Sequence, residues 1–450
     1  MTRSIPWLFL GACQSGSLGV VDKPVDTDVL VDTVSDTDAD SDSDTDTDAD
    51  TDADADTDLE TDTVETGFPP TTGDTSTEPY DAPPPVPDVV VDCLGAGDFL
   101  TIQAAIDGSV SGTKIGVQPC TYVELIDFRG KALDVYGLAG AATTILDGGG
   151  GGPIATFVRG EGFGTRLAGM TLTNGRDASG PSAVNVEYAH VILEDLVITG
   201  NARSATAIYN NGAMVTIIDT TIIGNLYSTF GGAPIDADTG SLLVTGSTID
   251  CDGADMGIDS HNATIVLDSS VVCDGGYGIF VDGGEIHARR TRIQGTGEEA
   301  LHAEDNPDNL SERVLLSNVE VVGGKQGAYL QYMNVEIEQS TFVASGDALQ
   351  LDDCRSDSSV VNSLFLGGAC DIRGDGQAYV VEWNGFTNGA GCEIKGQYTT
   401  LGDPLFVGPP ADLHLGAGSP AIDAGDPGVL DPDGTTSDLG RWGGPDMLVP

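Results

Sequence analysis

A short pattern of hydrophobic and polar residues recurs along most of the chain. Each copy holds a few apolar, often β-branched residues and ends in Gly or Asn, as in MTLTNG (170–175), STIDCDG (247–253) and STFVASG (340–346). Such a run closed by a turn residue is typical of a short strand that enters a turn. No stretch of ten or more residues in this region has the helical periodicity of an amphipathic helix. The pattern predicts many short strands separated by turns.

The spacing of the copies indicates a solenoid. The copies begin at Met170, Leu196, Thr220, Ser247, Ser269, Thr291, Ser317, Ser340, Asn362 and Asn384. Leucine-rich repeats have a similar period but need Leu at fixed offsets, and propeller blades are about twice as long. The nine-residue calcium β-roll repeat is suggested only at GGYGIFVDGG. We therefore predict an all-β fold, a right-handed parallel β-helix with roughly 22–27 residues per coil, a repeat length typical of solenoids.

Alternation within each coil predicts which side chains face outward. We place inward side chains at Val184, Ile208, Ile235, Ile258, Ile279, Leu301, Tyr329 and Leu349. Because successive strand residues point to opposite sides, the following residue of each coil faces outward. This first outward column comprises Asn185, Tyr209, Asp236, Asp259, Phe280, His302, Leu330 and Gln350. A second outward column, two residues further on, comprises Glu187, Asn211, Asp238, His261, Asp282, Glu304, Tyr332 and Asp352.

The cysteines give a second indication of the coil length. Cys251 and Cys273 are 22 residues apart, and so are Cys370 and Cys392. One coil would place each pair at the strand spacing of about 4.8 Å, which lies within the Cα–Cα range that a disulfide needs. We predict both bridges, and a third between Cys93 and Cys120 at the N-terminal end. Cys354 is left over, and its pairing with Cys370 remains an alternative.

Charge excludes some partners. The formal net charge is −53, and residues 22–92 hold 24 of the 71 acidic residues. From residue 93 onward the chain still has 47 acidic against 16 basic residues. Nucleic acid is therefore not a partner, because phosphate binding requires a basic surface. An acidic polysaccharide would also be repelled unless divalent cations such as Ca²⁺ bridged the two surfaces.

The N-terminal region predicts export and a tether. The start MTRSIPWLFLGAC resembles a bacterial lipoprotein signal, with residues 1–12 as the signal peptide and Cys13 acylated. Gln14 in place of Asp implies the outer membrane or cell surface, and paired cysteines agree with an oxidising compartment. Residues 13–92 are predicted to be a disordered acidic tether, since Asp at every second position over 36–58 cannot bury apolar surface. This Asp-rich stretch does not match an EF-hand calcium loop, because the loop Gly and the distant Glu are missing.

Both ends of the remaining region, 93–450, resemble known proteins. DFLTIQAAIDGSVSGTKIGVQPCTYVELI (98–126) resembles the N-terminal cap and first coil of the pectin-lyase-like β-helix superfamily. The resemblance implies a capping helix around Ile102, Ala105 and Ile106, followed by a phrase with Tyr122 and Glu124. Residues 402–450, including GDPLFVGPPADLHLGAGSPAIDAGDPG, resemble the C-terminal segment of surface-anchored bacterial β-helix proteins of the choice-of-anchor group. This superfamily includes lyases, hydrolases, esterases and proteins without known chemistry.

The outward columns are the candidate functional face. This face carries carboxylates, two histidines and aromatic residues, which suit hydrogen bonding to sugar hydroxyls and stacking on sugar rings. Pairs of carboxylates about 5–9.5 Å apart could also catalyse glycoside hydrolysis. The polygalacturonase set of Asn-Thr-Asp, paired Asp and Gly-His-Gly is absent; GDALQLDDC (346–354) matches one piece only. A uronate lyase needs a base, and only Lys325 and Arg355 are near this face in the sequence.

We therefore predict a monomeric, surface-tethered lipoprotein whose β-helix binds a polysaccharide or another cell-surface polymer without catalysis. No cofactor is implied, apart from the Ca²⁺ that an acidic ligand would need. The alternative is a polysaccharide lyase or glycoside hydrolase of the pectin-lyase-like superfamily. A purely structural spacer is the third hypothesis.

Overall fold

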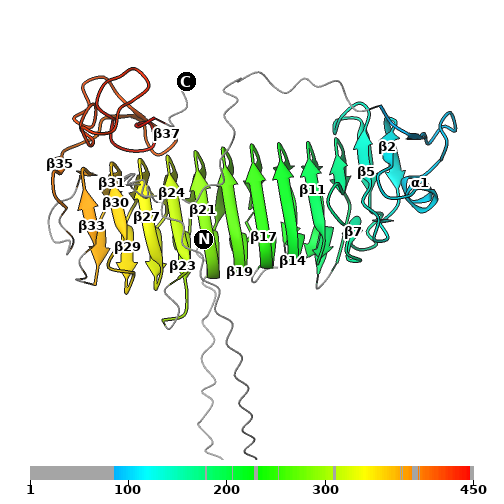
Figure 1. Cartoon of the computed structure of the whole chain (residues 1–450), viewed down its shortest axis with the longest axis horizontal. Helices are drawn as coiled ribbons and strands as arrows, with labels where there is room; N and C mark the ends of the chain where they lie inside the picture. The colour runs from blue at the N-terminus through cyan, green and yellow to red at the C-terminus, as the bar shows by residue number, and fades with distance from the viewer. Residues whose placement is uncertain are drawn as a thin grey trace, which may run out of the picture. The chain divides into compact units, whose positions relative to one another are not determined.

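The structure is a computed structural model that describes residues 86–445, except 178–179, 205, 228–231, 252, 308–310, 376, 378, 388–393 and 395. The predicted signal peptide, Cys13 and the acidic stretch as far as residue 85 lie outside the described residues. The described part is a parallel β-helix of about 12 turns, as the coil period predicts. Figure 1 shows its strands in rows that follow the chain order.

Each complete coil contributes strands to three faces. The first face consists of β4 (Ile126–Asp127), β7 (Ala155–Phe157), β10 (Pro181–Glu187), the first halves of β14 (Thr206–Ile218), β17 (Ala233–Thr245), β19 (Met256–Asp268) and β21 (Tyr277–Arg289), then β23 (Glu299–Glu304), β26 (Gln326–Gln331), β29 (Asp347–Asp352) and β32 (Cys370–Gly374). The second face consists of β1 (Val89–Val91), β2 (Lys114–Val117), β5 (Asp134–Gly137), β8 (Arg166–Ala168), β11 (His190–Glu194), the second halves of β14, β17, β19 and β21, then β24 (Arg313–Ser317), β27 (Asn334–Glu338), β30 (Ser359–Val361) and β33 (Val380–Glu382).

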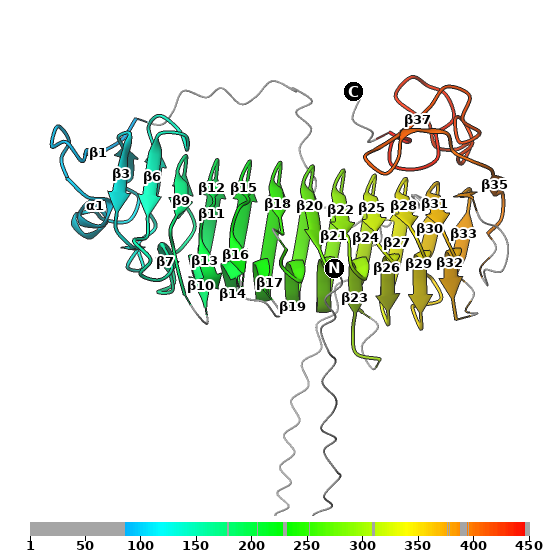
Figure 2. The same cartoon turned by 180° about the vertical axis from the view of Figure 1, so that it is seen from behind.

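The third face is a separate sheet, and most of its strands are labelled in Figure 2. It consists of β3 (Cys120–Val123), β6 (Thr144–Asp147), β9 (Thr171–Thr173), β12 (Val197–Ile198), β15 (Thr221–Ile222), β18 (Thr248–Asp250), β20 (Val271–Gly275), β22 (Arg292–Gly295), β25 (Glu320–Gly323), β28 (Thr341–Ala344), β31 (Leu364–Gly367), β34 (Gly385–Phe386) and β35 (Thr400–Leu401). A short parallel pair, β13 (Ala202–Ser204) and β16 (Leu226–Tyr227), lies apart from the three faces.

The core is a set of apolar ladders inside the coils. On the first face the buried ladder runs through Val184, Ile208, Ile235, Ile258, Ile279, Leu301, Ala328, Leu349 and Ile372. The predicted inward position Tyr329 is wrong by one residue, since Ala328 occupies it and Tyr329 faces outward. The prediction aligned the large Tyr329 with Leu301, whereas in the structure the small Ala328, which follows Gly327, takes the inward position. A tyrosine in that position would bury its hydroxyl group, which would then need a hydrogen-bond partner.

A ladder of hydroxyl groups explains the recurring Ser and Thr. At the turn from the second to the third face, one residue has a positive φ, as at Asp219 (47°) and Ser269 (51°). The next hydroxyl donates to the backbone carbonyl two residues earlier and accepts a backbone N–H from the preceding coil. For Ser247 Oγ these distances are 2.9 Å to Thr245 O and 3.1 Å to Thr220 N. Buried turns between coils therefore have their polar backbone atoms satisfied.

The N-terminal end is capped as the resemblance implied. Helix α1 (Ile102–Gly108) buries Ile102, Ala105 and Ile106. The Glu124 carboxylate accepts hydrogen bonds from the backbone N–H groups of Ile102 (2.8 Å) and Gln103 (2.9 Å), which have no partner within the helix. No helix of the described residues is long and apolar enough to cross a bilayer. Strand β1 precedes residue 93 and pairs with β2, so the folded region begins earlier than the predicted boundary.

The cysteines bear out one predicted bridge. Cys93 and Cys120 form a disulfide with a Cα–Cα distance of 6.5 Å. Cys370 is also disulfide-bonded, and its predicted partner Cys392 lies outside the described residues, so the Cys370–Cys392 pairing stays a prediction.

The predicted bridge between Cys251 and Cys273 is wrong. Cys251 is a buried cysteine that forms no disulfide. The physical reason lies in the strand register, which pairs Asp250, and not Cys251, with Cys273. The step between these two coils is therefore one residue longer than the spacing of the two cysteines, and their assumed vertical alignment does not occur.

Cys354 is a buried thiol, so its alternative bridge to Cys370 is wrong. Its Sγ lies 3.3 Å from the carbonyl oxygen of Leu330, to which the thiol donates. Burial raises the pKa of this thiol to about 11, which keeps it protonated and unreactive at neutral pH.

The C-terminal segment, residues 402–445, folds back beside the last coils. It contains the antiparallel pair β36 (Phe406–Gly408) and β37 (Asp412–Leu415), seen near the C-terminal end of the row in Figure 2. Leu439 and Ala421 of the segment pack against Leu364 of β31. The segment therefore covers part of the third face and leaves the first face uncovered by these contacts.

Candidate functional site

The strand register brings the predicted outward residues of the first face into two columns. The first column runs through Asn185, Tyr209, Asp236, Asp259, Phe280, His302, Tyr329, Gln350 and Arg373. The second runs through Glu187, Asn211, Asp238, His261, Asp282, Glu304, Gln331 and Asp352. We call these two columns together the column face. Neighbouring members stand at the strand spacing of about 4.8 Å.

Two positions of the prediction are wrong. The one-residue error at Tyr329 makes Leu330 a buried core residue, and Tyr329 takes its place in the first column. In the second column Gln331 stands beside Glu304, whereas Tyr332 lies in the turn after β26 with φ 58°. The prediction overlooked the small Ala328 between Gly327 and Tyr329. In the structure Ala328 occupies the inward position.

Carboxylates and one histidine dominate the middle of the column face. His261 Nε2 lies 3.3 Å from Asp259 Oδ1, and His261 Nδ1 lies 3.7 Å from Asp282 Oδ2. On the preceding coils, the Tyr209 hydroxyl donates to Asp238 Oδ2 at 3.0 Å. The Asp259 side chain is only 15% exposed, whereas Asp282 is 60% exposed. The carboxylates thus range from largely buried to solvated within three coils.

Burial and neighbouring negative charges shift the pKa values of these side chains. Desolvation, together with the charges of Asp238 and Asp259, raises the pKa of Asp236 to about 7 against the opposing effect of His261. Desolvation also raises the pKa of Asp259. Desolvation and the hydrogen bond to Asp238 raise the pKa of Tyr209 to about 12. Near neutral pH, Asp236 is therefore partly protonated and can both donate and accept hydrogen bonds.

Aromatic rings occupy the next three coils. The His302 ring stacks between Phe280 (centroids 4.7 Å apart) and Tyr329 (5.1 Å), and Tyr277 meets both Phe280 and His302 edge-on. These rings therefore cover one another's faces. Burial, together with the charge and hydrogen bonding of Asp352, raises the pKa of Tyr329 to about 12. The sequence prediction did not include Tyr277 and Glu299, which stand just before the columns on β21 and β23.

Several polar atoms of the column face are buried and have no hydrogen-bond partner. They are Asn185 Oδ1 and both ring nitrogens of His302, with Glu299 Oε2 beside them. The nearest carboxylate oxygens to His302 are 3.6 Å (Glu304) and 3.7 Å (Glu299) away, beyond normal hydrogen-bond length. Unpaired buried polar atoms cost free energy, so this face is suited to a ligand that supplies hydrogen bonds.

Two pairs of predicted residues, one at each end of the column face, are joined by hydrogen bonds. Asn185 Nδ2 donates to Glu187 Oε1 at 3.1 Å, and Gln350 Nε2 donates to Asp352 Oδ2 at 2.7 Å. Within the described residues, no three His, Cys, Asp or Glu side chains are grouped so as to hold a metal ion. The Ca²⁺ of the sequence prediction would therefore need ligand oxygens in addition to those of the column face.

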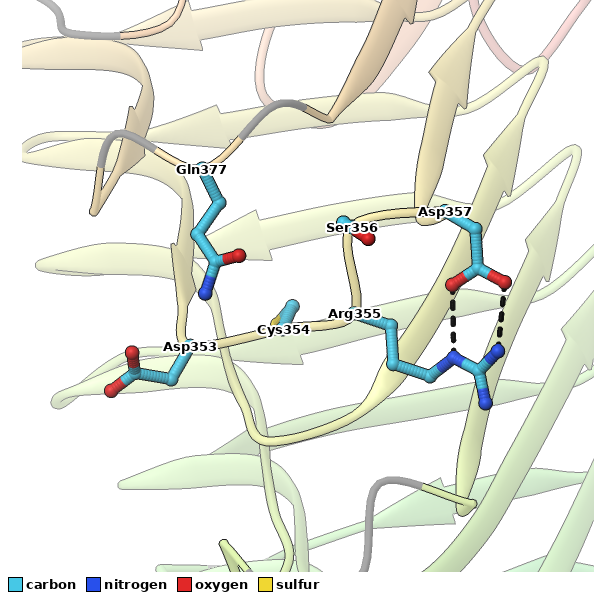
Figure 3. Close-up of a pocket in the computed structure, with 6 residues that line it drawn as sticks. All are labelled: Asp353, Cys354, Arg355, Ser356, Asp357 and Gln377. Atoms are coloured by element: carbon cyan, nitrogen blue, oxygen red, sulfur yellow. Dashed lines mark hydrogen bonds and ion pairs between the residues drawn. The ribbon is translucent and has the colours of Figure 1, made fainter.

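The basic residues on or near this face are paired with acidic residues. Lys325 pairs with Glu298, and Arg373 pairs with Asp347 at 2.5 Å. Figure 3 shows Arg355 paired with Asp357 in a cavity of about 430 Å³ that Cys354 and Gln377 also line. No Lys or Arg of the described residues extends from the middle of the two columns, so the base that a uronate lyase needs is not found there.

The raised pKa of Asp236 predicts a pH dependence of stability. The unfolded-state pKa is about 4, so folding takes up a proton between pH about 4 and about 7, and stability falls as the pH rises through this window. Replacing Asp236 by Asn removes the titrating group. We expect D236N to melt at a higher temperature than the wild type at pH 8, with a smaller difference at pH 4.

Thermal unfolding across this pH range is the measurement, and D282N, at the exposed carboxylate, is the matched control. Its melting-temperature difference from the wild type should stay nearly constant. If D236N and D282N showed the same pH profile, the inferred protonation of Asp236 would be incorrect.

Comparison with known proteins gives similarity in backbone only. No protein-family model matches the chain, and no curated protein matches it. Similar solved structures include a pectin methylesterase from carrot (14% identity, TM-score 0.27, covering 71% of this chain and 89% of that chain). A surface adhesin of Streptococcus pneumoniae, PfbA, has 12% identity and a TM-score of 0.35, covering 67% and 86%. The pectate lyase Pel9A has 12% identity and a TM-score of 0.40, covering 79% and 95%. Likeness at this level leaves the activity open.

Proposed function

We propose that this chain is a surface-tethered β-helix protein that binds a hydroxyl-rich glycan along the column face without turning it over. The observation that carries the proposal is the set of partnerless polar atoms at Asn185 and His302. These atoms lie on different coils of the first face, in the first column. Sugar hydroxyls both donate and accept hydrogen bonds, so one extended chain satisfies acceptors and donors along the columns.

Charge restricts the class of glycan. The column face carries carboxylates on most of its coils, and the bases nearest to it are paired with acids. A neutral glycan avoids like-charge repulsion, whereas an acidic one would require bridging divalent cations. We therefore expect neutral polysaccharides to bind best and Ca²⁺ to matter only for acidic ligands.

A glycan array with and without Ca²⁺ tests this proposal, with the chain beginning at residue 14. We expect H302A to weaken binding at least tenfold, because His302 supplies two of the partnerless atoms. The matched control is Y188A, which removes an aromatic side chain that is 72% exposed in a turn. Equal loss in both variants, or no binding to a broad panel, would reject glycan binding and leave the structural spacer.

A second candidate function is glycoside hydrolysis. It is favoured by Asp236, with a pKa of about 7, standing one coil from Asp259. A protonated and an ionised carboxyl group about 5 Å apart are the arrangement of a retaining glycosidase. Reducing-sugar release that disappears in D236N and D259A would establish this function, whereas binding without product supports the non-enzymatic one. An assay for unsaturated products tests the lyase alternative in parallel.

The tether is tested separately because it lies outside the described residues. We expect Cys13→Ala to release the protein from the membrane fraction, since acylation at Cys13 is the proposed attachment. Unchanged membrane association would contradict the proposed lipid anchor and would not affect the proposed glycan binding.

A further inference from the structure

The outer surface of the second face is apolar in its middle. Strands β11, β14, β17 and β19 (Figure 1) run side by side there in parallel register, and every second side chain points outward. Met214 is 48% exposed and Leu243 is 37% exposed, although both are large and apolar. We call the outward side chains at the centre of these strands the apolar patch: Ile192, Met214, Thr216, Ile218, Leu243 and Val266.

An aromatic ring extends the apolar patch towards the N-terminal coils. Phe163 is 79% exposed and stacks on His190, with the ring centroids 4.0 Å apart. His190 stands beside Met214 in the strand register, so the ring adjoins the patch. A contiguous exposed apolar surface on a folded protein marks an interaction site more often than isolated apolar side chains do.

The apolar patch is electrically neutral on a strongly acidic protein. Among the outward side chains on its four strands, only Glu194 and Asp268 are carboxylates. Arg166 Nε lies 2.6 Å from Glu194 Oε2. Arg289 and Arg290 both hold Asp268 Oδ2, at 2.7 Å and 2.6 Å.

This neutrality matters for contact between two copies of the chain. The formal net charge is −53, so two copies repel each other over most of their surfaces. At the apolar patch they can meet without bringing unpaired carboxylates together. The charge of the protein thus opposes self-association elsewhere and permits it here.

The shape and size of the patch indicate what kind of contact forms. A single sheet supplies all four strands, so the surface is flat and fits a copy of itself, as a two-fold interface requires. Four strands spaced about 4.8 Å apart and five residues of about 3.3 Å each cover roughly 14 Å by 13 Å. This area is well below the roughly 800 Å² per partner of a standard stable interface, so the contact is reversible.

We propose that a second copy of this chain docks on the apolar patch, patch against patch, and forms a reversible two-fold dimer. The monomer predicted from the sequence is then the dilute form of the protein. The column face lies on the first face, outside this contact, so a dimer presents two column faces. The proposal does not depend on what the column face binds.

Sedimentation velocity of the chain beginning at residue 14 tests the dimer. We expect a monomer–dimer equilibrium with a Kd of roughly tens to hundreds of micromolar, because the contact is small. Association should strengthen with salt, since raising the ionic strength from about 0.01 M to about 1 M shortens the Debye length from about 30 Å to about 3 Å and screens the repulsion. A monomer at both ionic strengths, at concentrations up to roughly 1 mM, would overturn the proposal.

Matched variants locate the contact. We expect Leu243→Asp to weaken dimerisation at least tenfold, because it places an unpaired carboxylate in an apolar interface. The control is Ile223→Asp, which adds the same charge at an aliphatic side chain that is 40% exposed and follows β15 of the third face; it should dimerise as the wild type does. Met214→Asp gives an independent measurement should L243D fold poorly.

Two results with these variants would contradict the proposal. Equal dimerisation of L243D and I223D would show that the apolar patch is not the contact. A chain that stays monomeric but binds phosphatidylcholine vesicles, with binding lost in L243D and kept in I223D, would assign the patch to a membrane surface and overturn the dimer.

Discussion

Replacing Glu320 by glutamine is expected to cost about 3–5 kcal/mol and to release the C-terminal segment from the coils. Glu320 Oε2 accepts from Arg292 of the neighbouring coil and lies 3.1 Å from Arg441 Nη1 of the segment. The Glu320 side chain is 4% exposed, and the two arginines are 15% and 13% exposed. Removing the only carboxylate from a buried triad leaves two uncompensated cations, which costs this much in comparable cases.

The loss should be local. Arg441 also donates from Nη2 to the carbonyl oxygen of Arg290 (3.0 Å), and Arg292 Nη2 donates to Pro410 O (2.7 Å). The triad therefore fastens two parts of the segment, at 410 and 441, to the coils. Because each coil of a solenoid packs mainly on its neighbours, we expect the N-terminal coils to remain protected when the segment detaches.

Limited proteolysis and hydrogen exchange of residues 402–445 measure this effect. The matched control is Glu336→Gln, since Glu336 pairs with Arg313 at 2.8 Å but the two side chains are 38% and 30% exposed. An exposed pair of this kind contributes about 0–1 kcal/mol, so E336Q should behave as the wild type. Wild-type protection of the segment in E320Q would show that the triad does not hold it.

Removal of the Cys93–Cys120 disulfide is the second large effect that we expect. The bridge joins the turn after β1 to the start of β3 and closes a loop with a sequence separation of 27. The chain-entropy model gives about 3–4 kcal/mol for a loop of this size. The first coil and α1 depend on this contribution, because the end coil has a neighbour on one side only.

The double variant C93A/C120A should show faster hydrogen exchange in α1 and β1 than the wild type, with later coils unchanged. The matched control is C354A, which removes a buried thiol that forms no bridge and should leave exchange in α1 unaltered. Equal protection of α1 in C93A/C120A and the wild type would contradict a stabilising role for this bridge at the N-terminal end.

The repeated phrase was sufficient to predict the fold class because its cause is local. The coils share a turn residue with positive φ, and in many of them the next residue carries a hydroxyl that bonds to the preceding coil, as Ser247 and Ser270 do. These requirements recur once per coil and so appear as a period in the sequence. The same period failed by one residue at Cys251 and Cys273, since the phrase alone does not reveal that the step between their coils is one residue longer than their spacing.

The column face was predictable in outline but not in its interactions. Strand alternation placed Asp236, Asp259 and His302 outward, and the structure agrees. Alternation does not reveal that His302 stacks between Phe280 and Tyr329, or that Asp236 is desolvated enough to raise its pKa to about 7. Those properties depend on the packing of neighbouring coils, where insertions shift the alignment, as the error at Tyr329 shows.

The sequence by itself thus determined the β-helix, its capping helix with Glu124, the Cys93–Cys120 bridge and most of the outward columns. The β-helix and the columns follow from short-range spacing and from a vertical repeat that adds one strand per coil, whereas the capping helix was implied by the resemblance of residues 98–126 to a known superfamily, which also supported the bridge. Only the tertiary structure decided where the C-terminal segment lies and which buried groups it brings together. Glu320, Gln339 and Asn318 meet residues of that segment, far away in the sequence, and no period in the sequence encodes a contact that occurs once. A cavity of about 300 Å³ between the segment and the turns of the coils exists for that reason, since it forms between a repeating body and a segment that does not repeat.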